Sequence, residues 1–336
     1  MTISRETLAR FQAAEDAPAT IEVLLGPDEW NEGLRRDALA GLSADPKTLP
    51  PTWLYDEAGS ALYDEITRVP EYYPARTEQS ILDDWADEMI ATAGADTLVE
   101  LGSGTSDKTR ALLDEMAATG RLRRYVPFDV AESTLRDSAR RIAQLYNVEV
   151  HGVVGDFRRH IDSIPEGGTR LFAFLGGTIG NLDPAERRTL LGQISEAMNP
   201  GDTLLLGTDL IKDRGRLVRA YDDAAGVTAA FNKNVLAVLN HELDATFDLD
   251  EFDHVALFDE QEQRIEMRLR ARSSHSVDLP GLGLSIDFAE GEELRTEISS
   301  KFRPDLVRRE LADAGLVVNR MWTDPDGDFA LTMAVR

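Results

Sequence analysis

Two glycines and a lysine form a short loop after an apolar segment. Gly102 and Gly104 follow the run from Thr97 to Leu101, and Lys108 comes four residues later. Glycine lets the backbone turn sharply and approach a ligand, and the N-terminus of a following helix carries partial positive charge. A dinucleotide fingerprint needs a third glycine where this chain has Asp107, and a Walker A motif needs a glycine directly before Lys108. The loop alone therefore predicts only a backbone placed close to a ligand.

Acids follow the next two apolar segments. Asp129 is placed to accept hydrogen bonds from both hydroxyls of a ribose. Asp156 can meet an adenine amino group, and the adjacent Phe157 can cover the ring. With the glycine loop and a later Pro-Gly-Asp turn, this series resembles the S-adenosylmethionine-dependent methyltransferases with a Rossmann-like core. The missing third glycine disfavours the alternatives, which are a nicotinamide enzyme and a non-catalytic α/β domain.

A polar loop follows the fourth apolar segment, Arg170 to Leu175. It contains three glycines, Thr178 and Asn181. Ligands in open α/β sheets lie beyond the carboxyl ends of the strands, so this loop would face the reacting group. The Asn181 amide combines an acceptor with two donors and can orient an amine and a carboxylate together. The Asn/Asp-Pro-Pro-aromatic motif of many amine and nucleic-acid methyltransferases is absent, and a simple turn is the alternative interpretation.

The order of the segments predicts the elements that position these residues. Short apolar runs alternate with amphipathic helices in the middle of the chain, which is typical of a doubly wound, mainly parallel sheet. Residues 213–240 are predicted to be helical, and alternating segments within 253–300 predict antiparallel strands. We expect an α/β fold with a Rossmann-like methyltransferase core and a second, α+β substrate-binding domain. The expected boundaries are 77–211 and 302–336 for the core, and 1–76 and 212–301 for the second domain.

Composition narrows the class of partner. The 336 residues include 36 basic and 61 acidic side chains, a net charge of −25 that disfavours nucleic acid and anionic membranes. The absence of cysteine excludes disulfides, thiolate zinc sites and a cysteine nucleophile. Met1 to Asp16 lacks the apolar stretch of a signal peptide, and the five histidines show no metal-ligand spacing. We expect a cytoplasmic, monomeric protein with a small-molecule partner, no metal, no nucleic acid and no membrane contact.

Longer stretches carry a more specific resemblance, which covers nearly the whole chain after about residue 33. They are Leu49–Asp56, Pro70–Glu78, Glu100–Gly104, Gly180–Leu182, Gly207–Leu210, Arg219–Asp223 and Thr296–Phe302. They are similar to the histidine Nα-methyltransferases of ergothioneine biosynthesis. Members of that family transfer three methyl groups from S-adenosyl-L-methionine to the α-amino group of L-histidine and produce hercynine. The resemblance thus implies this reaction, this methyl donor and this substrate.

The resemblance also implies roles for individual residues. The cofactor site would be lined by Gly102, Lys108, Asp129, Asp156 and Phe157. Histidine would be bound by Tyr72, Asn181, Tyr221, Glu297 and Ser299, with Tyr55 and the Gly176 carbonyl near its amino group. Asn181, Tyr55 and Gly176 would therefore be catalytic, and Met267 would form an apolar wall.

Side-chain chemistry agrees with the roles on the substrate side. Glu297 can accept a hydrogen bond from an imidazole N–H, and Ser299 can pair with the other ring nitrogen. Tyr72 and Tyr221 can donate to a carboxylate without adding charge. Gly177 departs from the small hydroxyl residue expected in close relatives.

Structural roles and other functions stay open at this point. Tyr72 and Tyr221 would also serve as packed aromatics, and Glu297 lies in an acid-rich stretch of the kind that is usually solvated. One alternative function is N-methylation of another amino acid, such as a tryptophan derivative. Because indole has a single N–H, the Glu297 and Ser299 pair favours imidazole. The other alternative is a non-catalytic module that binds S-adenosylmethionine or an amino acid.

Overall fold

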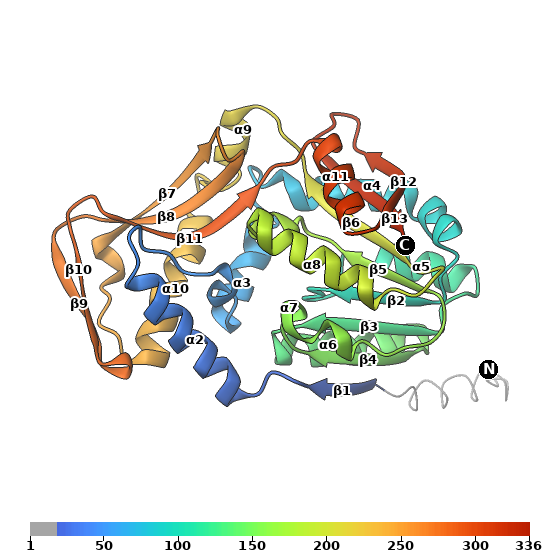
Figure 1. The fold of residues 1–336 in the computed structure, drawn as a ribbon, viewed down its shortest axis with the longest axis horizontal. Helices are drawn as coiled ribbons and strands as arrows, with labels where there is room; N and C mark the ends of the chain where they lie inside the picture. Colours follow the sequence, from blue (N-terminus) through green and yellow to red (C-terminus); the bar gives the residue numbers. More distant parts are fainter. Residues whose placement is uncertain (1–18) are drawn as a thin grey trace, which may run out of the picture.

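The computed structural model describes residues 19–336, which form two lobes (Figure 1). The expectation for Met1 to Asp16 lies outside the described residues. The larger lobe contains an eight-stranded sheet of order β1-β4-β3-β2-β5-β6-β13-β12. The first six strands pair in parallel, and β13 runs antiparallel to both of its neighbours. Their bounds are β1 Ala19–Val23, β2 Thr97–Leu101, β3 Arg124–Asp129, β4 Glu149–Val154, β5 Arg170–Phe174, β6 Thr203–Asp209, β12 Val317–Thr323 and β13 Phe329–Val335.

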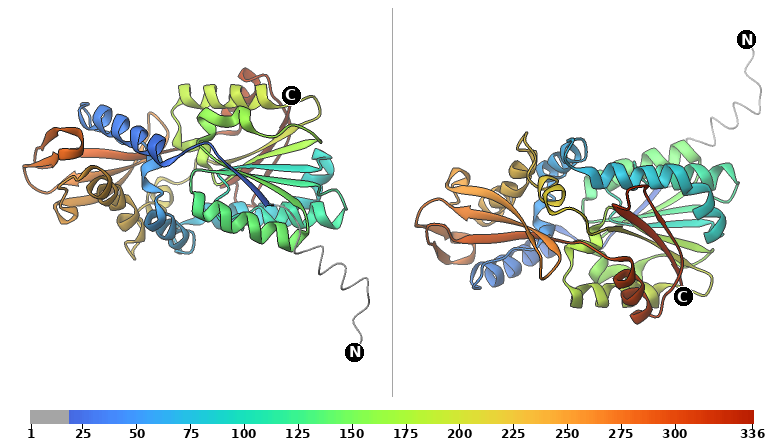
Figure 2. Two further views of the ribbon diagram at one scale, coloured as in Figure 1. Left: turned by 90° about the horizontal axis from the view of Figure 1, so that it is seen from below. Right: turned by 90° about the horizontal axis from the view of Figure 1, so that it is seen from above.

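Helices cover both faces of this sheet (Figure 2). On one face lie α4 (Tyr73–Ala93), α5 (Arg110–Ala118) and α6 (Glu132–Tyr146). On the other lie α7 (Phe157–His160), α8 (Pro184–Ala197) and α11 (Pro304–Asp313). Every residue of β2, β5 and β6 is buried, as expected for parallel strands covered on both sides. The predicted Rossmann-like α/β core is confirmed.

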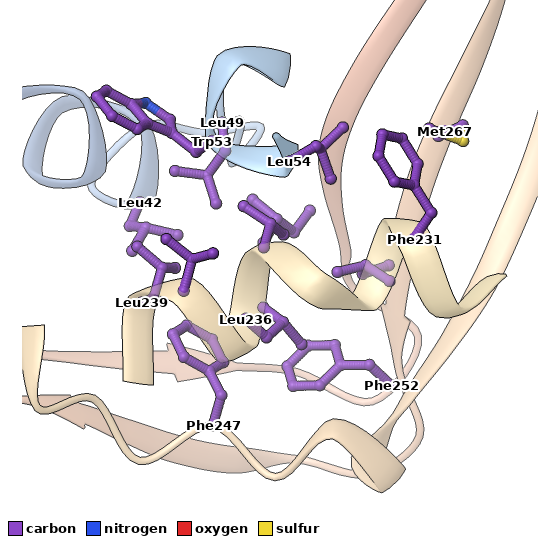
Figure 3. Close-up of a cluster of buried hydrophobic side chains, with 14 of the residues drawn as sticks. Leu42, Leu49, Trp53, Leu54, Phe231, Leu236, Leu239, Phe247, Phe252 and Met267 are labelled. Carbon is purple, nitrogen blue, oxygen red and sulfur yellow. The ribbon is translucent and has the colours of Figure 1, made fainter. Parts of the chain in front are cut away.

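The smaller lobe has α+β character, as predicted. Its helices are α2 (Pro27–Leu42), α3 (Glu57–Ile66), α9 (Arg214–Arg219) and α10 (Val227–Leu243). A three-stranded antiparallel sheet contains β7 (Phe252–Asp259), β8 (Arg264–Ala271) and β11 (Glu293–Ser300), and a hairpin contains β9 (His275–Leu279) and β10 (Leu284–Phe288). Figure 3 shows its core, where Phe231, Leu236 and Leu239 of α10 lie among apolar residues that include Leu54 and Phe252.

Short 3₁₀ helices complete the fold. They are η1 Pro51–Leu54, η2 Ile161–Ser163, η3 Thr178–Asn181, η4 Leu249–Glu251 and η5 Pro280–Leu282. Two of them bear on the site, because η1 leads into Tyr55 and η3 ends at Asn181.

Strand β1 belongs to the larger lobe, although the predicted boundaries placed it in the second domain. It pairs with β4 in the large sheet, so the assignment of residues 1–76 to the second domain is wrong for Ala19–Val23. The Ile21 side chain occupies the space above Gly152. A Cβ at Gly152 would lie 2.7 Å from Ile21 Cδ1. The missing side chain on β4 therefore leaves room for this half-buried strand to pair at the edge of the sheet. The remaining boundaries stay a prediction.

The predicted helical region 213–240 is interrupted between α9 and α10. Gly226 has φ of +76°, and the Asp223 carboxylate accepts hydrogen bonds from the backbone N–H groups of Val227 and Thr228. Asp223 therefore caps a new helix, because its oxygens satisfy N–H groups that have no partner within α10. The break leaves Tyr221 in the connection between the helices, where its hydroxyl lies 2.8 Å from Ser299 Oγ.

Candidate active site

The glycine loop lies at the carboxyl end of β2 and is held by an acid from β3. Gly102 and Gly104 have φ of +73° and +49°, where a side chain would cause strain. The Gly104 N–H donates to Asp129 Oδ2 at 2.8 Å, and the Ala131 N–H donates to Oδ1 at 2.9 Å. Burial raises the pKa of the Asp129 carboxyl, against the opposing effect of these N–H groups. Each oxygen keeps a lone pair for a ribose hydroxyl.

A cleft of about 1630 Å³ opens beside this loop. It is lined by the five predicted cofactor residues, Gly102, Lys108, Asp129, Asp156 and Phe157. A Cβ at Gly102 would have only the Phe157 ring within 4 Å, so the loop presents bare backbone to the cleft. This space and these acceptors fit the nucleoside of S-adenosylmethionine.

Asp156 and Phe157 stand at the start of α7, after β4. Asp156 accepts from the Arg158 backbone N–H at 3.0 Å, and its Oδ2 lies 2.8 Å from Arg158 Nη2. The Phe157 ring packs edge-on against Phe128 and Phe174, with centroids 6.5 and 5.3 Å away. An adenine amino group would therefore share Asp156 with Arg158.

Glu78 connects the glycine loop with the polar loop after β5. Its fully buried carboxylate pairs with Lys108 and accepts from the Gly176 N–H at 2.8 and 2.9 Å. Although burial lowers the pKa of the Lys108 ammonium, the attraction of Glu78 raises it overall. Gly207 leaves room for this carboxylate, because a Cβ there would lie 2.4 Å from Glu78 Oε1. Glu78 thus fixes a cofactor-side lysine and a substrate-side backbone at once.

An inner pocket of about 40 Å³ borders the cleft, and Tyr55, Asn181 and Glu297 line both spaces. The pocket brings together all the residues predicted for the substrate side, Tyr55, Tyr72, Gly176, Asn181, Tyr221, Met267, Glu297 and Ser299. Its volume is near that of one water molecule, so a bound amino acid must also use the adjoining cleft or push these side chains apart.

A β-bulge in β11 turns Glu297 toward this pocket. Arg295 pairs with Arg268 and Glu297 pairs with Met267, which leaves Thr296 as the extra residue. With regular alternation, Glu297 would lie on the same half-exposed face of the sheet as Arg295. The bulge instead places Glu297 on the buried face. Burial raises the pKa of the Glu297 carboxyl to about 7, although nearby Lys301 acts to lower it.

The wall opposite is aromatic. Tyr55 packs edge-on against Phe231 with centroids 5.3 Å apart, and Tyr72 packs edge-on against Tyr221 at 6.1 Å. Burial raises the pKa of the Tyr55 and Tyr72 hydroxyls well above the usual value. Both phenols therefore stay protonated and are hydrogen-bond donors at neutral pH.

Comparison with known proteins identifies the family. The family described as histidine-specific methyltransferase, SAM-dependent, matches residues 34–336, which is most of the chain. The chain belongs to this family. The predicted resemblance is confirmed, and S-adenosylmethionine is the family's methyl donor.

Several relatives of this histidine-specific methyltransferase family are similar over most of the chain. A histidine N-alpha-methyltransferase from Mycolicibacterium smegmatis is 59% identical over 93% of this chain and 98% of its own length. One from Mycobacterium tuberculosis is 55% identical over the same shares. Ergothioneine biosynthesis protein 1 from Schizosaccharomyces pombe is 32% identical over 71% of this chain and 31% of its own length.

Three residues of this methyltransferase site were missed from the sequence. Glu78 gives a weak signal, an acid on the apolar face of α4 one turn before Leu82. Tyr63 lines both the cleft and the inner pocket, but it lies on α3 with helical spacing typical of a core residue. Lys301, which contacts Tyr221 and Ser299, follows β11 and lies in the Thr296–Phe302 stretch of the resemblance, but it was given no role there.

Carboxylates also meet away from the site. Within residues 19–336, Asp324, Asp326 and Asp328 come close together in the turn between β12 and β13. Asp324 Oδ1 accepts from two backbone N–H groups, and Asp328 lies 2.5 Å from Arg216 Nη2. These contacts account for the turn, and the expectation of no metal stays a prediction. No helix in the same residues is long and apolar enough to cross a membrane.

Proposed function

We propose that the protein transfers three methyl groups from S-adenosyl-L-methionine to the α-amino group of L-histidine. The product is hercynine, the betaine of histidine used in ergothioneine biosynthesis. The observation that carries this proposal is the inner pocket, where Glu297 and Ser299 project from one face of β11 into a space also lined by Asn181. Membership of the family supports the same reaction.

The Glu297 and Ser299 pair suits an imidazole ring. Glu297 has no hydrogen-bond donor from the described residues on its carboxylate, so both oxygens remain available for a ring N–H. Ser299 Oγ lies 2.8 Å from the Tyr221 hydroxyl and offers a partner for the second ring nitrogen. An indole would use only one of these two groups, so the pair favours histidine over a tryptophan derivative.

Catalysis would depend mainly on positioning and exclusion of water. S-adenosylmethionine supplies an electrophilic methyl group when bound. Asn181 and the Gly176 carbonyl would orient the amine, and the protonated hydroxyls of Tyr72 and Tyr221 would bind the carboxylate. Tyr55 would close the site beside the amino group, which must arrive without its proton for its lone pair to attack.

Two close contacts between distant parts of the chain support this arrangement. Gly180 lies so close to β11 that a Cβ there would be 2.9 Å from the Ser300 carbonyl oxygen. Asn181 therefore stands against the strand that carries Glu297 and Ser299. Glu78 holds the Gly176 backbone from the other side, so the loop has little freedom to move away from a substrate.

The decisive experiment offers the purified protein S-adenosylmethionine with an equimolar mixture of amino acids. Mass spectrometry should find one product, histidine heavier by three methyl groups. A methylated tryptophan derivative would replace the proposed substrate, and the absence of any product would favour a binding module.

We further propose that the protein acts as a cytoplasmic monomer without nucleic-acid or membrane partners. The net charge of −25 and the absence of cysteine support this, and residues of the smaller lobe already line the inner pocket. Analytical ultracentrifugation should give a single species of about 37 kDa, and a dimer would contradict the proposal.

A further inference from the structure

Lys301 is a buried lysine behind the residues that line the inner pocket. Its side chain has no exposed surface. Its Nζ lies 2.8 Å from Asp209 Oδ2, 2.9 Å from the Tyr221 hydroxyl and 2.8 Å from Ser299 Oγ. An ammonium group has three N–H donors and no acceptor, so these three contacts use all of its hydrogens.

These contacts determine how the two hydroxyl groups can act. Because the ammonium donates to both oxygens, Tyr221 and Ser299 must direct their own hydrogens elsewhere. The two oxygens lie 2.8 Å apart, so one hydrogen bridges them. The other hydrogen is free to point into the inner pocket that both residues line. Lys301 therefore makes this pair a hydrogen-bond donor toward a ligand.

Lys301 shares its carboxylate partner with a second ammonium group. Asp209 also pairs with Lys212 and accepts from the Tyr73 hydroxyl at 2.8 and 2.9 Å. Two ammonium groups thus face the Asp209 carboxylate, with Glu297 acting on Lys301 and Asp328 on Lys212. The Lys301 ammonium lies one hydroxyl away from the pocket. The Tyr221 ring also lies over Lys301, with its centroid 4.7 Å from Nζ. Lys301 and the two hydroxyls in front of it therefore favour a hydrogen-bond acceptor on the ligand at this wall.

We propose that Lys301 is a positioning residue for the amino-acid substrate, which it acts on through Tyr221 and Ser299. It makes the hydroxyl pair a donor of one hydrogen toward the ligand and places a positive charge behind that pair. This inference rests on the proposed function, because histidine offers the matching acceptors, its carboxylate oxygens and an unprotonated ring nitrogen. Lys301 would thus contribute to substrate selection without touching the substrate.

Lys212 provides a matched control within the same cluster. It pairs with the same Asp209 carboxylate and is nearly as buried, but its second partner is the Tyr73 hydroxyl at 2.7 Å. Lys212→Met removes one positive charge from the cluster without changing the contacts of Tyr221 or Ser299. Lys301→Met removes the same charge together with the orientation of both hydroxyls, and Lys301→Gln keeps N–H donors without the charge.

The test is calorimetric titration of each variant with L-histidine in the presence of S-adenosylhomocysteine, together with steady-state kinetics. Lys301→Met should weaken histidine binding by about 10- to 100-fold, the usual effect of losing a charged hydrogen-bond partner. Its KM for histidine should rise more than its kcat falls, and Lys301→Gln should be intermediate. Lys212→Met should stay within about threefold of the wild type, and all three should keep their affinity for S-adenosylhomocysteine.

A double-variant background tests whether Lys301 acts through the hydroxyls. In a Tyr221→Phe, Ser299→Ala chain, Lys301→Met should cost less than about threefold, because no hydroxyl remains to be oriented. The full Lys301→Met effect in that background would overturn the proposal, and so would equal losses in Lys301→Met and Lys212→Met. Variants at Lys301 that all lose S-adenosylhomocysteine would also overturn it, because the ammonium would then serve the fold. A wild-type chain that neither binds nor methylates histidine would instead refute the proposed function.

Discussion

The two sides of the cleft are assembled in different ways. The cofactor side uses loops that directly follow the neighbouring strands β2, β3 and β4, so its residues lie within one stretch from Gly102 to Phe157. The amino-acid side collects residues from six separate segments in both lobes, between Tyr55 and Ser299. The first arrangement follows from the parallel sheet itself, whereas the second depends on how the lobes pack together.

This difference predicts how each side of the cleft responds to amino-acid substitution. A substitution on the cofactor side changes a local loop that the sheet still supports. A substitution on the amino-acid side changes a pocket wall whose residues come from both lobes and contact one another. The two sides should therefore respond separately to substitution, except at Glu78, which contacts both.

Asn181→Ala should have the largest effect and should separate the two sides most clearly. Loss of the amide that orients the amine should lower kcat by about 100-fold. Affinity for S-adenosylmethionine, measured by calorimetry, should change by less than about twofold, since Asn181 belongs to η3 after β5 and not to the glycine loop. Normal turnover in this variant would refute the role proposed for Asn181.

Glu297→Ala should weaken the amino-acid side alone. Removing the acceptor for the ring N–H should raise KM for histidine by about 10- to 100-fold, as for other charged hydrogen bonds. Binding of S-adenosylmethionine should be unchanged in the same preparation. Equal losses of both ligands would mean that the variant disturbs the fold.

Asp129→Ala should have the opposite effect and weaken the cofactor side alone. It removes the proposed ribose acceptor and also the partner of the Gly104 N–H, so affinity for S-adenosylmethionine should fall by about 10- to 100-fold. Histidine binding, measured separately, should be retained. If histidine binding fell equally, the two sides would not be independent.

The pH dependence of histidine binding should identify Glu297. Burial raises the pKa of this carboxyl to about 7, so the neutral acid prevails at pH 6 and the carboxylate, a stronger acceptor, prevails at pH 8. The ionised fraction rises by about tenfold over this range, and histidine affinity should rise with it. Glu297→Gln removes this titration, so the difference between the two proteins separates it from the titration of histidine itself. Identical pH profiles would exclude Glu297.

The same shift affects stability in the opposite direction. Because the folded pKa lies above the unfolded one, Glu297 contributes stability below about pH 4.5 that is lost as the pH rises through about 7. The melting temperature of the wild type relative to Glu297→Gln should therefore decline between pH 5 and pH 8.

Gly207→Ala should have the smallest effect but should affect both sides. A Cβ there would lie 2.4 Å from Glu78 Oε1 and would displace the carboxylate that holds Lys108 and Gly176. We expect a loss of about 1–3 kcal/mol in the free energy of unfolding, with modest weakening of both ligands. Gly192→Ala is the matched control, because a Cβ at that position on α8 meets nothing within 4 Å. An unchanged melting temperature in Gly207→Ala would contradict the role of Glu78.

The sequence predicted the cofactor side well because its signals are local. Gly102, Asp129 and Asp156 each follow an apolar strand, and parallel strands bring their carboxyl ends to one edge of the sheet. The alternation of strands and helices likewise predicted the Rossmann-like core. Strand β1 was missed because its pairing depends on the space above Gly152, a long-range feature.

The amino-acid side was predicted through family resemblance and not through spacing. Glu297 lies among acids that look solvated, and only the bulge at Thr296 shows why it is buried. Glu78 and Lys301 fall within stretches of the family resemblance but were given no role, because Lys108 and Tyr221 lie 30 and 80 residues away from them in the chain. Tertiary contacts of this kind have no local signature.

The bulge in β11 also bears on how such a pocket can change over evolutionary time. Deletion of Thr296 would remove the bulge but keep Glu297 opposite Met267. The side chains of Glu297 and Ser299 would then stay on the face that lines the pocket. Losing a residue between Glu297 and Lys301 would instead invert every side chain beyond it. Insertions and deletions in this strand, more than exchanges of one amino acid for another, are therefore the steps by which a lineage would acquire a different wall.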